Sequence, residues 1–413
     1  MTAIAFRPRL LAGWATDASR DDLAAHLARH GPLPRLTPDA LIARVDAAGL
    51  RGRGGGGFPT AAKLRAVAAG RRRRPVVVAN GCEGEPASHK DAALLDCAPH
   101  LVLDGIALVA HALGATTAIL AVHVGAADRV REEVAARRDR VPVRVEEVPG
   151  RYVASEETAV VQYLSGGPAL PTTSPPRPGE RGIRGAPTLV DNVETLAQLA
   201  LIARYGPAWF RETGTPDLPG TLLVTTGGAV QAPGVVEVPA GTPVRAVLDL
   251  AGGPTELVQA VLSGGYGGAW LGAPAIDTAL SHTALREAGS VLGVPTLLAL
   301  PARACGLTQT AHLVRYLSGE SAGQCGPCRF GLPAVADDLT AIACATRDAP
   351  AAADRLARRL GLVTARGACA LPDGAARLTR SALHVFAADL RDHLRGRPCG
   401  GAAAAPLFPV VHG

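Results

Sequence analysis

Lysine is almost missing from this chain of 413 residues. Of its 42 basic residues 40 are arginine, and only Lys63 and Lys90 are lysine. We interpret this bias as a general drift towards arginine, so the two remaining lysines mark positions that need a compact ammonium group. Aromatic residues are also few (3 Trp, 5 Tyr and 6 Phe), and none interleaves with the one basic run, Arg71–Arg74. Nucleic acid is therefore not an expected partner.

Long apolar segments are missing as well. The run near Ser290–Ala302 is shorter than the roughly 20 residues that a membrane span needs, and the longer stretch Leu101–Ala127 contains Asp104 and His111. No basic-then-apolar leader opens the sequence. We therefore expect a soluble, cytoplasmic protein without a span of its own, which leaves open membership of a membrane-associated complex. The apolar content of 48% excludes a disordered chain.

The first half of the chain alternates between strand and helix patterns. Apolar runs at Val76–Ala79, Ala118–His123 and Val141–Val148 predict strands, with amphipathic helices at Pro99–Leu113 and Ala126–Ala136 between them. Such alternation is typical of βαβ units around a mostly parallel sheet. We expect an α/β, Rossmann-like domain over residues 1–215.

The second half predicts three further parts and a tail. Short strands and one helix around Gly-Gly and Pro-Gly turns suggest a small β-grasp-like module over 216–275, followed by a linker over 276–304. Helical spacing alone remains over 305–395, which predicts a helical bundle in which Cys344 lies mid-helix as a small buried side chain. The Ala-, Pro- and Gly-rich tail 396–413 is expected to be loose.

Four polar segments are candidate ligand sites. Four glycines precede an expected helix that contains Lys63, and such a loop lets backbone N–H groups approach an anion at a helix N-terminus. Asn80–Pro86 follows the first strand, at the edge where open α/β sheets bind ligands. Ser155–Thr158 and Pro187–Thr195 place acidic and capping residues at helix starts. Taken singly, each could instead be an ordinary loop or a capped turn.

Together and in this order, the segments resemble one family: the flavin- and NADH-binding subunit of respiratory complex I and its relatives in NAD-linked hydrogenases and formate dehydrogenases. The resemblance covers residues from about 45 to 395 and includes the β-grasp region, which resembles the family's soluble-ligand-binding module. Its motifs are RGRGGGGFPT at 51–60, NGCEGEP at 80–86, SEETA at 155–159, PTLVDNVETLA at 187–197 and GQCGPCRFG at 323–331.

The resemblance implies a flavoprotein that accepts a hydride from NADH on FMN and passes electrons to an iron–sulfur partner, either a thioredoxin-like [2Fe–2S] subunit or a ferredoxin. Glu83 is the candidate catalytic residue. The positions that surround flavin or nicotinamide in the family are Arg53, Gly54, Gly55, Gly56, Gly57, Phe58, Lys63, Asn80, Cys82, Glu83, Ser155, Glu156, Glu157, Val190, Asp191, Asn192 and Thr195. We expect the FMN phosphate against the glycine loop and Lys63.

Several positions depart from the family pattern. Cys82 stands in place of Asp, Ser155 in place of Gly, and Asp191 in place of the first Asn of a pair. Ala66 and Arg177 replace two phenylalanines that stack on the NADH adenine, which predicts weaker NADH binding.

The segment that resembles the family's [4Fe–4S] site departs too. Ala322 takes the place of the first cysteine, which leaves Cys325, Cys328 and Cys369 as candidate metal ligands. Ser321 or Glu320 could substitute for the missing thiolate, the three thiolates could hold zinc, or the cluster could be lost. Two other functions stay open: an FMN-binding paralogue with another electron donor, and a non-catalytic assembly or ligand-binding subunit.

Overall fold

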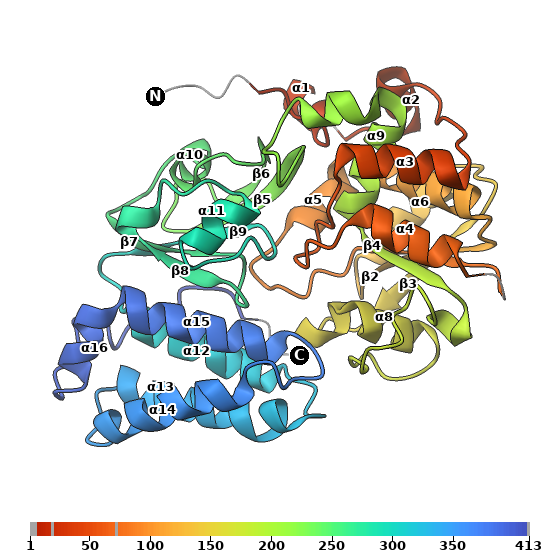
Figure 1. The fold of residues 1–413 in the computed structure, drawn as a ribbon. Coiled ribbons are helices and arrows are strands. Elements are labelled where there is room, and N and C mark those ends of the chain that lie inside the picture. The colour runs from red at the N-terminus through yellow and green to blue at the C-terminus, as the bar shows by residue number, and fades with distance from the viewer. Residues whose placement is uncertain (1–5, 18–19, 71–72, 411–413) are drawn as a thin grey trace. The chain divides into compact units, whose positions relative to one another are not determined.

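The computed structural model describes residues 6–17, 20–70 and 73–410. These form two compact units (Figure 1). The first contains the described residues up to Gly84 together with His89–Val224 and Glu237–Thr242. The second contains Glu85–Ser88, Thr225–Val236 and the chain from Pro243 onwards. In the basic run Arg71–Arg74, residues 71 and 72 lie outside the described part.

A four-stranded parallel sheet forms the centre of the first unit. Its order is β3-β2-β1-β4, with bounds Val76–Asn80 (β1), Thr117–His123 (β2), Val143–Val148 (β3) and Thr188–Asn192 (β4). Most of β1, β2 and β4 is buried, as expected for parallel strands whose two faces are both covered. The chain proceeds from β1 to β2 and β3 on one side and then returns to place β4 on the other side of β1. The expected α/β sheet is confirmed.

Nine α-helices belong to the described part of this unit. Alanine and leucine make α6 apolar nearly all round, and it is mostly buried against β1, β2 and α9. The bounds are Ala12–Asp17 (α1), Leu23–His30 (α2), Pro38–Ala48 (α3), Thr60–Ala68 (α4), Lys90–Cys97 (α5), Pro99–Leu113 (α6), Ala127–Ala135 (α7), Glu157–Leu164 (α8) and Val193–Arg211 (α9).

A mixed sheet with the order β6-β5-β9-β7-β8 follows in the chain. Strand β5 begins in the first unit and ends in the second. The bounds are Thr221–Gly228 (β5), Gly234–Pro239 (β6), Val258–Ser263 (β7), Ala269–Gly272 (β8) and Thr296–Pro301 (β9), with helices Val244–Leu250 (α10) and His282–Glu287 (α11).

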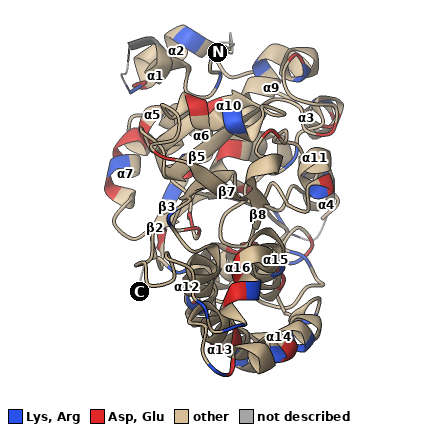
Figure 2. Cartoon of the chain, turned by 90° about the vertical axis from the view of Figure 1, so that its left-hand side faces the viewer, with Lys and Arg blue, Asp and Glu red and all other residues tan. Residues whose placement is uncertain are grey.

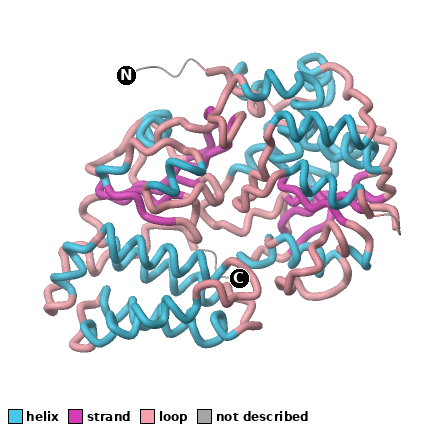
Figure 3. Tube along the Cα trace, viewed as in Figure 1, coloured by secondary structure: helices cyan, strands magenta, loops and turns pink. Residues whose placement is uncertain are grey.

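From Gly306 to His393 the second unit consists of helices and their connections (Figure 3). The bounds are Gly306–Gly319 (α12), Leu332–Ala343 (α13), Ala349–Val363 (α14), Leu371–Val385 (α15) and Ala387–His393 (α16). The charged residues of α13 are both acidic, whereas three of the four on α14 are arginine (Figure 2). Buried Asp338 on α13 pairs with Arg355 and Arg359 on α14. The expected helical region is confirmed.

Three details differ from the expectations. Residues 276–304 were expected to be a linker but supply β9, the central strand of the mixed sheet; because both faces of β9 are covered, its sequence shows no alternation. Cys344 is exposed at the end of α13, not buried mid-helix. The tail is held as far as it is described, since Phe408 is buried and Leu407 N–H donates to Gln309 Oε1 at 2.8 Å.

Among the described residues, no single helix has the length and apolar character to cross a membrane. One bent pair, α5 with α6 at 94°, meets that criterion by length and composition only.

Candidate functional site

The predicted site residues of the first unit gather where β1 and β4 end. The two strands are parallel neighbours, and their last residues, Asn80 and Asn192, lie in register with each other. Because the strand order reverses between β1 and β4, this is the topological switch point of the sheet, where open α/β folds bind ligands. Strand pairing thus brings together two residues that lie more than 100 positions apart in the sequence.

The two asparagines tie the surrounding segments together. Asn80 Nδ2 donates to the carbonyl of Ser155 at 2.9 Å, and Asn80 Oδ1 accepts the N–H of Cys82 at 3.1 Å. Asn192 caps α9, since its Oδ1 accepts the N–H of Glu194 at 3.0 Å, and its Nδ2 donates to Asp91 Oδ2 at 2.6 Å. The loops after β1 and before α8 are therefore fixed at the end of the sheet.

The glycine loop reaches the same place. A Cβ built on Gly54 would lie 3.2 Å from Asn192 Cβ, so the loop backbone passes directly beside the end of β4. Gly55 and Gly57 have φ values of 99° and 59°, a region that favours glycine. A Cβ on Gly56 would meet no atom within 4 Å, so one side of the loop is open. This combination fits the backbone cradle for an anion that the resemblance implies.

The start of the loop is anchored by Arg53. Its N–H donates to Thr195 Oγ1 at 2.9 Å, and its buried guanidinium donates to the carbonyl of Pro219 at 2.7 Å. Burial lowers the pKa of Arg53 to about 10, against the opposing charge of Glu194. Nε and Nη1 of Arg53 have no hydrogen-bond partner among the described residues. Arg53 therefore holds the loop by its main chain and side chain together.

Lys63 lies among acceptors. Its Nζ donates to Glu157 Oε2 at 3.0 Å and to the carbonyl of Val190 at 2.8 Å, and Asp191 Oδ1 is 3.8 Å away. Burial alone would lower the pKa of Lys63, but Asp191 and Glu157 outweigh it and raise the pKa. Burial also raises the pKa of Asp191 to about 6, with Lys63 opposing the rise. The site thus contains a carboxyl group that titrates close to neutral pH.

Lys90 belongs to the same site; in the sequence it follows the second motif, but it was not among the expected cofactor-binding residues. It is buried at the start of α5, where Nζ is 2.6 Å from Asp91 Oδ1, 3.0 Å from Glu194 Oε2 and 3.1 Å from Asn192 Oδ1. Burial lowers its pKa, but the charges of Asp91 and Glu194 prevail and raise it. The scarcity of lysine was the signal that could have identified Lys90, since both lysines of the chain stand at this switch point.

The neighbouring carboxylates of the third motif have different roles. Glu156 is the N-cap of α8, and its Oε2 accepts the N–H groups of Thr158 and Ala159 at 2.8 and 3.1 Å. Glu157 instead pairs with Lys63. Ser155 is accommodated because its neighbour is Gly84, where an added Cβ would lie 2.1 Å from Ser155 Oγ.

Cys82 and Glu83 follow β1. Cys82 is buried, and burial followed by the charge of Asp91 raises the pKa of its thiol, so the thiol stays protonated at neutral pH. Glu83 Oε2 accepts the N–H of Ala92 at 3.0 Å. Phe58 is 38% exposed beside the glycine loop, with the guanidinium carbon of Arg177 5.3 Å from its ring centre.

The three predicted metal ligands are brought together in the second unit. Cys328 lies on a π-helical turn, Pro327–Gly331 (η4), directly before α13. Burial, the hydrogen bond to Cys325 and the charges of Cys325 and Cys369 raise the pKa of Cys328 to about 12. Burial opposes ionisation of Cys325, but the N–H groups of Ala368 and Cys328 prevail and lower its pKa. These contacts fit a site with three thiolate ligands, and Ala322 leaves it without the fourth thiolate that the resemblance implies.

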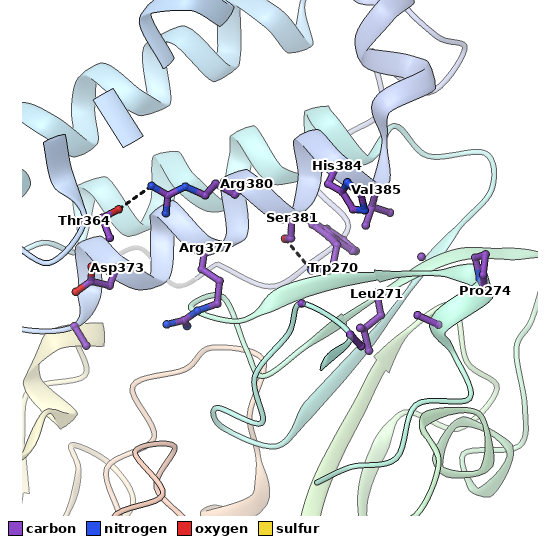
Figure 4. A pocket seen from close by; sticks show the side chains of 15 residues that line it. Trp270, Leu271, Pro274, Thr364, Asp373, Arg377, Arg380, Ser381, His384 and Val385 are labelled. Carbon is purple, nitrogen blue, oxygen red and sulfur yellow. Dashed lines mark hydrogen bonds between the residues drawn. The ribbon is translucent and has the colours of Figure 1, made fainter. Parts of the chain in front are cut away.

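A cavity of about 950 Å³ lies in the second unit between β8 and α15 (Figure 4). Trp270 and Leu271 line one side and Arg377 and Arg380 the other. Arg377 Nη1 donates to the carbonyl of Gly267 at 2.6 Å, and Arg380 Nη2 donates to Thr364 Oγ1 at 3.0 Å. None of the predicted site residues lines this cavity.

Comparison with protein families assigns three regions of the chain. Residues 45–201 match the Nuo51 FMN-binding domain, residues 223–266 the SLBB domain, and residues 308–393 the NADH-ubiquinone oxidoreductase-F iron-sulfur binding region. The chain thus carries an FMN-binding domain and an iron–sulfur binding region.

Individual relatives match along most of their length. The F 2 subunit of the NADH-quinone oxidoreductase of Rhizobium meliloti (strain 1021) is 32% identical over 386 residues, which cover 89% of this chain and 91% of the relative. The HndC subunit of the NADP-reducing hydrogenase of Solidesulfovibrio fructosivorans is 28% identical, over 88% of this chain and 78% of the relative. In the crystal structure of an NAD+-reducing [NiFe]-hydrogenase in the H2-reduced state, one chain is 31% identical with a TM-score of 0.80, over 94% of this chain and 67% of that one.

Proposed function

Because the chain belongs to the family of the NADH-quinone oxidoreductase F subunit, an electron-transfer flavoprotein family, we propose how its own site works. The protein accepts a hydride from a reduced nicotinamide nucleotide and delivers single electrons to an iron–sulfur partner. One observation carries the proposal: the glycine loop, Asn80 and Asn192 meet at the switch point of the parallel sheet, with Gly54 against Asn192.

Bound FMN supplies the chemistry, since a flavin takes up two electrons with a hydride and releases them one at a time. The chain supplies position and electrostatics. The open side of Gly54–Gly57 receives the phosphate through backbone N–H groups, and Lys63 provides the one ammonium group at the site that is partly accessible, with 23% of its side chain exposed. Glu83, Glu156 and Glu157 orient the flavin and nicotinamide rings. The protonated thiol of Cys82 adds no charge to the site.

The donor is NADH or NADPH. Ala66 is exposed on α4 and offers no ring for the adenine, while Arg177 beside Phe58 presents a guanidinium group. A guanidinium can stack on an adenine or bind the 2′-phosphate of NADPH. This second reading, a paralogue with a changed donor, rests on Arg177.

Electrons leave through the iron–sulfur region. Cys325, Cys328 and Cys369 are its proposed ligands, and the acceptor is a thioredoxin-like [2Fe–2S] subunit or a ferredoxin in a cytoplasmic or membrane-associated complex. The domain boundaries at residues 215, 304 and 395 stay predictions, whereas no boundary falls at 275, because β9 belongs to the mixed sheet.

The flavin content of purified variants tests the proposal. Lys63→Ala removes a charge-assisted contact worth about 1.5–3 kcal/mol, so FMN retention should weaken about 10- to 100-fold. Arg65→Ala is the matched control, because Arg65 lies on the same helix and pairs with exposed Asp46. FMN is measured by its absorbance after release, and reduction of the bound flavin is followed with NADH and with NADPH. A native protein without flavin would favour the non-catalytic alternative, and equal flavin in both variants would contradict the placement at Lys63.

A further inference from the structure

A second group of metal-ligating side chains lies in the second unit, away from the predicted cluster cysteines in sequence. Cys305, His393 and Cys399 place one ligand atom each within 4.8 Å of one another. Cys305 and His393 are buried, and Cys399 is partly buried. Cys305 and Cys399 fall outside residues 308–393, the matched iron–sulfur region. The described residues hold no other group of three potential ligands as close as this one.

The hydrogen bonds of His393 indicate its tautomer. Its Nδ1 is 3.1 Å from the carbonyl oxygen of Ile342, which can only accept, so Nδ1 carries the proton. The lone pair is therefore on Nε2, where it accepts the N–H of Cys399 at 3.1 Å and faces Cys305 Sγ at 3.9 Å. Metal-binding histidines are usually oriented in this way, with the distal N–H donated to a carbonyl or carboxylate.

The two thiols are suited to share a cation. Cys305 is the N-cap of α12, and its Sγ accepts the N–H of Thr308 at 3.4 Å, which fixes the sulfur at the start of the helix. Cys399 brings its Sγ to within 4.8 Å of Cys305 Sγ, and a bound metal would displace the thiol protons.

The Cys305–His393 distance is close to that at a single tetrahedral ion. Zinc–sulfur bonds of about 2.3 Å and zinc–nitrogen bonds of about 2.0 Å put tetrahedral sulfur and nitrogen ligands roughly 3.6 Å apart. The Cys305–His393 separation of 3.9 Å needs an adjustment of only a few tenths of an ångström. A multi-iron cluster binds its thiolates at separate corners and so spaces them more widely.

We propose that Cys305, His393 and Cys399 bind one zinc ion, with water in the fourth position. The ion joins the start of α12, the end of α16 and the tail. It is separate from the iron–sulfur site, and its role is to hold the tail against the helical region.

Metal analysis of the full chain tests this proposal. The protein is produced with zinc and iron in the medium, and both metals are counted by mass spectrometry. We expect about one zinc per chain in the native protein and in Cys344→Ser, a control at an exposed cysteine. Cys399→Ser and His393→Gln should contain less than about a tenth of the native zinc per chain and keep their iron. Cys325→Ser should lose iron and keep zinc.

A measurement on the native protein covers the case in which these variants do not fold. Removal of zinc with a chelator should make Cys305 and Cys399 reactive towards an alkylating reagent, as located by peptide mass spectrometry. Equal zinc in Cys399→Ser and native protein would overturn the proposal. So would loss of iron rather than zinc from Cys399→Ser, or a Cys305–Cys399 disulfide in zinc-free native protein.

Discussion

Asp191→Asn should stabilise the first unit in a way that depends on pH. Asp191 is 3% exposed in β4; one carboxylate oxygen is 3.8 Å from Lys63 Nζ, and the other has no hydrogen-bond partner among the described residues. Burial raises its pKa from an ordinary value of 3.8 to about 6. An asparagine removes the buried charge, and Lys63 keeps Glu157 and the carbonyl of Val190 as partners.

The direction of this pH dependence follows from the pKa values of Asp191 in the folded and the unfolded state. Because the folded-state pKa lies above the unfolded-state value, protonated Asp191 favours folding, and this contribution is complete only well below pH 3.8 and is lost as the pH rises through 6. At pH 7.5 the ionised form costs about 3 kcal/mol, of which about 2 kcal/mol develops above pH 4. The advantage of Asp191→Asn should therefore grow with pH by roughly 4–8 °C in melting temperature for a unit of this size.

Differential scanning fluorimetry of the flavin-free protein between pH 4 and 8 measures the effect. Asp39→Asn is the control for removal of an exposed carboxylate, since Asp39 lies in the first turn of α3. A melting-temperature difference for Asp191→Asn that stays constant or shrinks with rising pH would refute the reasoning.

Three other expectations can be measured directly. Replacing Ala66 and Arg177 together by phenylalanine should lower KM for NADH by about 30-fold, since each ring restores a stacking contact worth about 1 kcal/mol; an unchanged KM would mean that the adenine binds elsewhere. Ala322→Cys should raise the iron content and the stability of the cluster in air, as measured by anaerobic iron and sulfide analysis with electron paramagnetic resonance, and four irons per native chain would contradict this. Phe408→Ala should destabilise the second unit by about 3 kcal/mol and free the tail for proteolysis, because the buried ring lies 6.0 Å from Trp270; an unchanged rate of tail cleavage would count against this anchor.

Local sequence patterns predicted most elements of the first unit. The helix expected at Pro99–Leu113 has those same bounds, because Pro99 at its first turn and Gly114 after its end mark both termini. Within the helical region expected over 305–395, the break between α15 and α16 falls at Phe386, which packs edge-to-face on Trp270. That contact joins residues more than 100 positions apart, so no local pattern reports it.

In the candidate site, too, local patterns predicted single residues but not the contacts between distant parts of the chain. Asn80 and Asn192 could be placed at strand ends from their motifs, but their register with each other required the strand order. Glu194 resembled an ordinary helix-start acid, and only the fold brings it to Lys90. The sequence showed that Asp191 stands where the family has Asn. It did not show that the carboxylate is buried with one oxygen lacking a hydrogen-bond partner among the described residues.

The position of both lysines at the switch point gives the protein an unusual chemical property. Apart from its α-amino group, the chain offers amine-reactive reagents only Lys63 and Lys90, and Lys90 is enclosed, with 1% of its side chain exposed. Acylation within the folded chain is therefore directed to Lys63 beside the glycine loop. Among the lysine side chains, a label attached to the folded chain would then mark Lys63, and ligands that cover Lys63 would slow that labelling.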